Sequence, residues 1–138
     1  MDRSVRLFRD PHEVSAGRGL WPALWLNPED QRWPPEIDVV EIVNNGRDTT
    51  RDSFHLLRGI SAKNARVNFT RLDRRAAYRP GFDYAVNLHT FAVEWTEIAV
   101  RHYVDGVLVV DRAFEWKHND GTDGGPAHVL VNLGVGGR

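Results

Sequence analysis

The sequence predicts an all-β protein that folds as an antiparallel β-sandwich. Apolar residues alternate with polar ones, or form short β-branched runs, in several separate segments. Turn-forming glycine, proline, asparagine and aspartate residues separate these segments, and no segment shows a helical period. Several short strands with such punctuation are typical of a sandwich.

Strand patterns recur along most of the chain. Residues 19–26, GLWPALWL, alternate with period two. Residues 36–43, EIDVVEIV, follow a Trp-Pro-Pro break and consist largely of Ile and Val, which favour strands. The Asp105-Gly106 pair lies between two alternating segments and is the strongest short-range hairpin signal. The remaining expected strands are 52–57, 88–95, 99–104, 107–111 and 127–135.

Composition and charge exclude several classes of protein. The 18 basic and 19 acidic residues nearly cancel, so net charge gives no attraction to nucleic acid or to a membrane surface. The chain has no cysteine, which excludes disulfides and thiolate metal sites. No run approaches the roughly 18 consecutive apolar residues of a membrane span. We expect neither a nucleic-acid nor a membrane partner, and the sequence leaves the oligomeric state open.

Three carboxylates interrupt the Ile- and Val-rich segment, at Glu36, Asp38 and Glu41. On a regular strand Glu36 and Asp38 share a face and Glu41 points away. A β-bulge at Val39-Val40 would bring Glu41 back to the face of the other two. Carboxylates packed this closely raise one another's pKa values, so an ionised and a protonated acid coexist at neutral pH. A retaining glycosidase needs such a pair, roughly 5–5.5 Å apart.

The spacing alone also fits a solvated strand face or a calcium site built of carboxylates. Three nearby tryptophans, Trp21, Trp25 and Trp33, favour a glycan site because aromatic rings pack on the C–H faces of sugars. For one of Trp21 and Trp25, packing in the core is an equally good explanation.

Four segments resemble glycoside hydrolase family 16. EIDVVE is similar to the E-I/L-D-x-x-E active-site strand of the family, in the branch with the extra bulge residue. GLWPALWL resembles the G-x-W-P-A-x-W-L strand that precedes it, and LHTFAVEWT with VRHYVDG resembles the later hairpin. PAHVLVNLGVGG resembles a late family strand that contains N-L-x-V-G-G. These segments follow the family's order over residues 17–137. The family includes laminarinases, mixed-linkage glucanases and enzymes that act on galactans.

The resemblance implies a jelly-roll sandwich of the concanavalin A type that hydrolyses a β-linked polysaccharide internally, with retention. β-1,3-Glucan is the first expected substrate and mixed-linkage β-glucan the second. Glu36 would be the nucleophile, Asp38 the assisting carboxylate and Glu41 the acid/base. Substrate-binding residues would be Trp33, Trp21, Trp25, His55 and Asn132, although His55 and Asn132 fit a structural role equally well. No metal and no other cofactor is expected, and the family implies an extracellular location.

The chain departs from the family in its length. Family domains are usually much longer than 138 residues, so we expect residues 1–138 to form a single partial domain that lacks terminal strands. Such a domain would expose sheet edges and part of its core. Residues 1–14 also lack the apolar segment of a signal peptide.

Four alternative functions stay open. A transglycosylase would use the same carboxylates, and a glycan-binding module or an inactive fragment would not need them. A sulfated-galactan hydrolase would give a role to a basic segment, because guanidinium groups bind sulfate oxygens well. A solvated loop is the simpler explanation of that segment and the one we expect first. Its basic residues are Arg58, Lys63, Arg66, Arg71, Arg74, Arg75 and Arg79, against the single acid Asp73.

Overall fold

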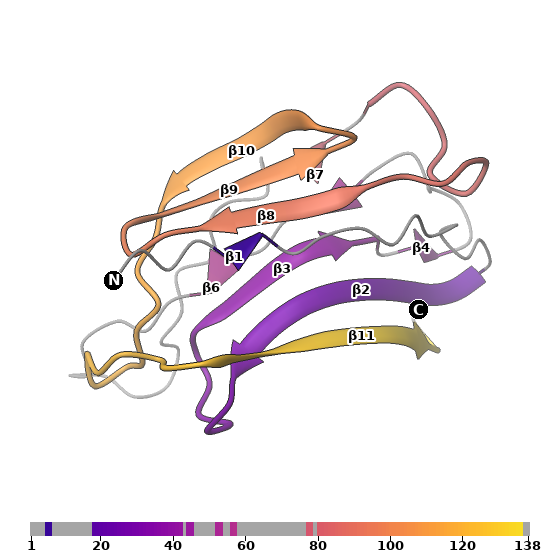
Figure 1. Ribbon diagram of the computed structural model, residues 1–138. Helices are drawn as coiled ribbons and strands as arrows, with labels where there is room; N and C mark the ends of the chain where they lie inside the picture. Colours follow the sequence, from indigo (N-terminus) through magenta and orange to yellow (C-terminus); the bar gives the residue numbers. More distant parts are fainter. Residues whose placement is uncertain are drawn as a thin grey trace.

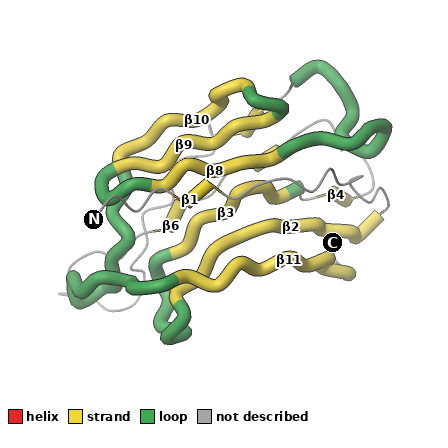
Figure 2. Tube along the Cα trace, viewed as in Figure 1, coloured by secondary structure: helices red, strands yellow, loops and turns green. Residues whose placement is uncertain are grey.

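The protein is a two-layer β-sandwich in the computed structural model (Figure 1). The structure describes residues 5–6, 18–42, 44–45, 52–53, 56–57, 77–78 and 80–136. Within these ranges every regular element is a strand, and no helix is long and apolar enough to cross a membrane. The tube in Figure 2 shows the strands gathered in two layers with loops at their ends. The predicted all-β class is therefore confirmed.

The smaller sheet has the order β1-β8-β9-β10, with all neighbours antiparallel. The larger sheet has the order β11-β2-β3-β5-β7, with β4 beside β2 and β6 beside β3. The strands of the smaller sheet are Val5–Arg6, Phe91–Trp95, Ala99–Val104 and Val107–Ala113. Those of the larger sheet, β2 to β7 and then β11, are Arg18–Pro28, Glu36–Glu41, Asn44–Asn45, Asp52–Ser53, Leu56–Leu57, Ala77–Tyr78 and Ala127–Val135.

The predicted hairpin joins β9 to β10. Asp105 and Gly106 both have positive φ angles, 49° and 80°, as the tight turn requires. The Asp105 carboxylate also accepts hydrogen bonds from the Thr90 backbone N–H at 2.8 Å and from His89 Nδ1 at 2.9 Å. These bonds tie residues 89 and 90 to the turn, and β8 consequently begins at Phe91 rather than at the predicted residue 88.

The core lies between the two sheets. β3 contributes Ile37 and Val39, and the facing strands β8 and β9 contribute alternate residues such as Val93 and Val100. Trp95 packs against Trp116 with ring centroids 4.8 Å apart, which closes one end of the core. The period-two patterns of the sequence therefore predict the correct inner faces.

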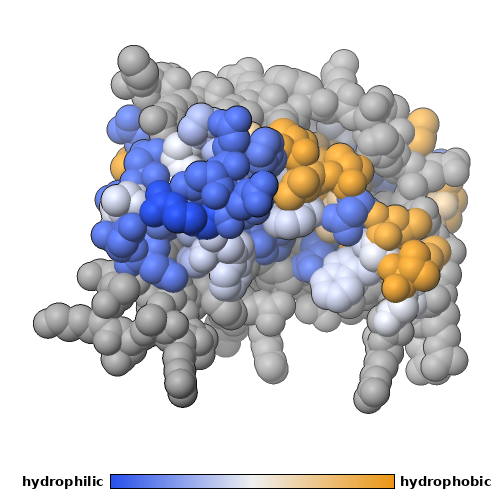
Figure 3. Space-filling view, turned by 90° about the horizontal axis from the view of Figure 1, so that it is seen from below, coloured by the Kyte–Doolittle hydropathy of each residue, from blue (hydrophilic) through white to orange (hydrophobic). Residues whose placement is uncertain are grey.

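One strand of the larger sheet differs from the rest. β11 pairs with β2 along its whole length, and its alternate residues Val129, Val131, Leu133 and Val135 continue the inner face of the sheet. All four are exposed, although their cross-strand neighbours Leu24 and Leu26 belong to the core or pack against it. Figure 3, which views the molecule from this side, shows apolar side chains gathered there.

Candidate active site

The bulge predicted in the acidic strand is present. The β2–β3 register pairs Glu41 with Ala23 and Asp38 with Trp25. The two acids lie three positions apart, whereas their partners lie two positions apart, so Val39 is the additional residue. Leu24 pairs with Val40 at the point where the register shifts.

The bulge places all three carboxylates on one face of the sheet. Residues directly opposite in an antiparallel pair point to the same side, and residues two apart on a strand do so as well. Ala23 and Trp25 share a face, so their partners Glu41 and Asp38 share it too. Glu36, two positions before Asp38, completes the row on the outer face, away from the core.

The row is not a solvated strand face. Asp38 is only 6% exposed and Glu41 only 9%, whereas Glu36 is partly exposed. Carboxylates are almost never this buried unless they have partners or a function. Among the residues that the structure describes, no three His, Cys, Asp or Glu side chains are arranged to hold a metal ion.

A histidine from the opposite sheet holds the bulge from inside. His102 of β9 is completely buried, and its Nε2–H donates to the main-chain carbonyl of Asp38 at 2.8 Å. Strand carbonyls normally bond neighbouring strands within the sheet, so this bond shows that the peptide after Asp38 turns toward the other layer. Burial lowers the pKa of His102 to about 4, partly opposed by this hydrogen bond.

Sequence reasoning missed His102. Its signal was a polar residue at an inner position of an alternating strand, between Val100 and Val104. A buried polar side chain needs a hydrogen-bond partner, and the bulge supplies one.

Trp33 contacts the first acid of the row directly. It lies in the connection between β2 and β3, where its Nε1–H donates to Glu36 Oε2 at 2.8 Å. A hydrogen bond of this kind favours the ionised form of a carboxylate. Trp33 remains 47% exposed, so part of its ring is open to a ligand.

Trp21, Trp25 and Asn132 also lie on the acidic face. Trp25 Nε1–H donates to Asn132 Oδ1 at 2.7 Å, across the β2–β11 pair. Trp21 lies opposite Gly134, where an added Cβ would be 3.3 Å from Trp21 Cβ, and the ring is 40% exposed. Neither ring belongs to the core cluster, so the core-packing explanation is wrong for both. His55 lies outside the described residues.

The two antiparallel layers and the acidic row define a jelly-roll β-sandwich protein with a polar site on one sheet face. The family model described as glycosyl hydrolases family 16 matches residues 10–131. The chain therefore belongs to glycosyl hydrolases family 16, as the sequence motifs predicted.

Individual relatives agree with this membership. The chain is 34% identical to the endo-1,3-1,4-beta-glycanase ExsH of Rhizobium meliloti (strain 1021), over 87% of this chain and 22% of that protein. It is 30% identical to a beta-glucanase of Rhodothermus marinus, over 90% of this chain and 45% of that protein. The laminarinase catalytic domain of Thermotoga maritima superimposes with a TM-score of 0.62 at 28% identity. The match covers 89% of this chain and 50% of that domain. The chain thus spans half or less of each of these proteins.

Proposed function

We propose that this chain carries the catalytic centre of a retaining endo-β-glucanase, with β-1,3-glucan as the first substrate and mixed-linkage β-glucan as the second. The observation that carries the proposal is the bulge at Val39, because it aligns Glu36, Asp38 and Glu41 on one face. Family membership and the glucanase activities of the relatives support the same conclusion. We propose an extracellular location on the same grounds.

The proposed reaction proceeds in two displacements. Glu36 attacks the anomeric carbon while the glycosidic C–O bond breaks, and Glu41 donates its proton to the departing oxygen. Glu41 then takes a proton from water, whose oxygen attacks the anomeric carbon and releases Glu36. The indole N–H of Trp33 stabilises the charge that Glu36 carries before attack and regains after release. Asp38 lies between the two glutamates, and we propose that it assists by helping to set which of them carries the proton.

Three tryptophans and one amide form the proposed sugar-binding surface. Trp21 and Trp33 present exposed ring surface, and Asn132 fixes the orientation of Trp25. Rings of this kind pack on the C–H faces of glucose units. His55 remains a predicted substrate-binding residue.

Release of new reducing ends from laminarin, mixed-linkage glucan, agarose and carrageenan tests the proposal. We expect release from laminarin first, and none from the Glu36→Gln variant. Release from agarose or carrageenan alone would favour a galactan hydrolase. Binding of laminarin without hydrolysis by either protein would favour a glycan-binding module, and new longer chains in place of reducing ends would favour a transglycosylase.

A further inference from the structure

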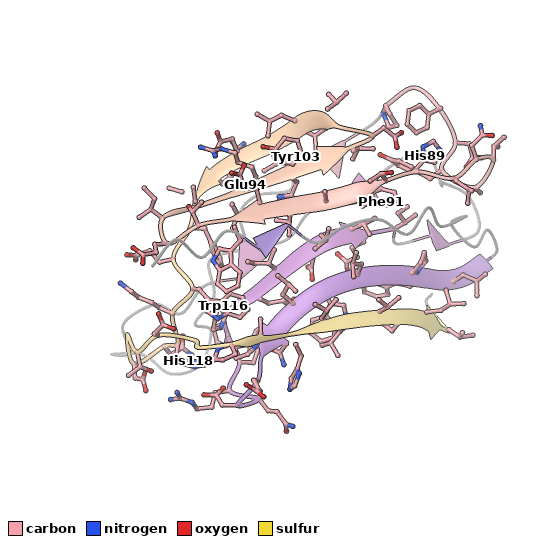
Figure 4. The ribbon with its side chains drawn as sticks, viewed as in Figure 1. His89, Phe91, Glu94, Tyr103, Trp116 and His118 are labelled. Atoms are coloured by element: carbon pink, nitrogen blue, oxygen red, sulfur yellow. The ribbon has the colours of Figure 1, made fainter. Side chains whose placement is uncertain are left out.

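Two connections that are distant in sequence pack together at one end of the sandwich. Residues 29–35 join β2 to β3, and residues 114–126 join β10 to β11. The backbone N–H of Glu29 donates to Pro126 O at 2.9 Å. Gly124 lies so close to Trp116 and Pro35 that an added Cβ would be 2.5 Å and 3.0 Å from their nearest atoms. Figure 4 shows Trp116 and His118 at this end.

His118 is the buried side chain that links the two connections. It is 4% exposed, and its Nδ1–H donates to the Pro34 carbonyl at 2.9 Å. Its Nε2 lies 3.3 Å from Asp30 Oδ2. Its own backbone is fixed by bonds to Thr122 and Gly121, at 2.9 and 3.0 Å. The ring therefore meets the 29–35 connection at two points from a rigid turn.

Charged residues surround the ring on its exposed side. Arg32 bonds Asp30 through Nε at 2.8 Å and Asp120 through Nη1 at 3.2 Å. All three side chains are about half exposed, and such ion pairs contribute little to stability. The bond of the buried His118 ring to Pro34 is shielded from water and is the stronger link.

Pro34 follows Trp33, whose indole donates to Glu36. We propose that His118 is a positioning residue of the catalytic centre, which acts through Pro34 to hold the Trp33 indole on Glu36. The role of Glu36 in this proposal rests on the proposed function. The contact between His118 and the residues next to Trp33 does not depend on the proposed function. The positioning role and the proposed function are therefore tested separately.

The indole N–H of Trp33 reports the positioning without any turnover. In a ¹⁵N–¹H spectrum, its signal is assigned by its absence from Trp33→Phe. We expect slow exchange with solvent in the full wild-type chain and at least tenfold faster exchange in His118→Phe, which keeps the ring volume but has no donor. His118→Asn, whose amide N–H takes the place of Nδ1–H, should restore slow exchange. Lys117→Gln, which breaks only an exposed ion pair with Glu115, is the matched control.

Kinetics provide the second readout. We expect His118→Phe to lower kcat roughly 10- to 100-fold, the loss that follows from small misplacement of a reacting group, with little change in KM. In the Trp33→Phe background the same substitution should lower kcat less than about threefold, because the two residues act as one unit. If His118 had only a structural role, His118→Phe would lower kcat by the same factor in the wild type and in Trp33→Phe.

The outcomes separate the two proposals. Faster indole exchange in His118→Phe from a wild type that hydrolyses nothing would keep the positioning role and reject the proposed function. An active wild type whose indole exchange and kcat are unaffected by His118→Phe would overturn the positioning role and leave the proposed function intact. Unchanged exchange in an inactive protein would reject both.

Discussion

Strands β3 and β11 belong to the same sheet but differ sharply in burial. Five of the six residues of β3 are buried, whereas none of the nine residues of β11 is. Both strands have apolar inner faces. The inner face of β3 meets the smaller sheet, while Val131 of β11 is 69% exposed although it pairs with Leu24, which packs against the core. An apolar pattern thus predicts which face points inward, but burial depends on an opposing layer.

The candidate site lies mainly on the buried strand β3 and only to a small extent on the exposed strand β11. Its carboxylates lie on the strand that is held on both faces, where His102 fixes the backbone from inside and Trp33 bonds Glu36 outside. β11 contributes one polar contact to this face, through Asn132. The comparison suggests that the chemistry depends on rigid support of β3 and only weakly on β11.

Acidification should have the largest effect on stability, through the buried His102 that supports β3. The pKa of His102 rises from about 4 in the folded protein to its ordinary value of 6.5 when the chain unfolds. Between these values the unfolded chain binds more protons, so the free energy of unfolding falls as pH decreases from about 6.5 through 4. The full loss is on the order of 3 kcal/mol below pH 4.

Urea unfolding from pH 7 to pH 4 measures this loss. His102→Phe is the control, since it removes the titrating group and keeps a ring of similar size. The wild type should lose more stability than the variant across this window. If the free energy of unfolding depended equally on pH in the wild type and in His102→Phe, His102 would not be a neutral buried residue that supports the bulge.

The next largest effect is expected at a valine of β3 when it is compared with a valine of β11. Val39→Ala on β3 removes buried methyl groups and leaves a cavity, so it should lower the free energy of unfolding by about 2 kcal/mol or more. Val131→Ala on β11 makes the same chemical change at an exposed position and should change it by less than about 0.5 kcal/mol. Chemical denaturation of the two variants measures both values, and similar losses would contradict the assigned difference in burial.

The link between β2 and β11 should have a smaller effect. Asn132→Ala removes the acceptor for the Trp25 indole, which should cost about 1 kcal/mol in stability. Because the Trp25 ring loses its fixed orientation, we expect KM for laminarin to rise with little change in kcat. Trp25→Phe, which lacks the indole N–H, should give a similar KM. If Asn132→Ala lowered kcat alone, Asn132 would act in the chemical step and not in substrate binding.

The smallest effect on stability is expected at the exposed apolar stripe of β11, which consists of Val129, Val131, Leu133 and Val135. Val131→Lys should change the free energy of unfolding by less than about 0.5 kcal/mol, because the side chain already meets water. It should reduce the binding of an apolar dye, since the stripe is exposed apolar surface. Unfolding of the variant would indicate that this face is covered.

The sequence predicted much of this architecture because it depends on local patterns. Strand patterns predicted the longer strands, but not the two-residue strands β1, β4 and β7. The Asp105-Gly106 pair predicted the hairpin, and the positions of Glu36, Asp38 and Glu41 on one strand led us to expect a bulge at Val39-Val40. These features are decided within a few residues of one another.

The supporting histidines could not be predicted in the same way. His102 bonds a residue 64 positions away, and His118 one that is 84 positions away. Each appears in the sequence as an isolated histidine, and its partner is a main-chain carbonyl, which carries no side-chain signal. Exposure of part of the core was expected, but the apolar pattern of β11 does not show that its own inner face is exposed, because burial depends on an opposing layer.

The proposed function depends on the bulge, which aligns Glu36 as nucleophile with Glu41 as acid/base. Trapping the covalent intermediate with a 2-deoxy-2-fluoro glucoside that has a good leaving group tests it most directly, with peptide mass mapping of the labelled protein. We expect one glycosyl group on Glu36 in the wild type and none in Glu36→Gln. A label on another carboxylate, or hydrolysis with inversion and no label, would contradict it.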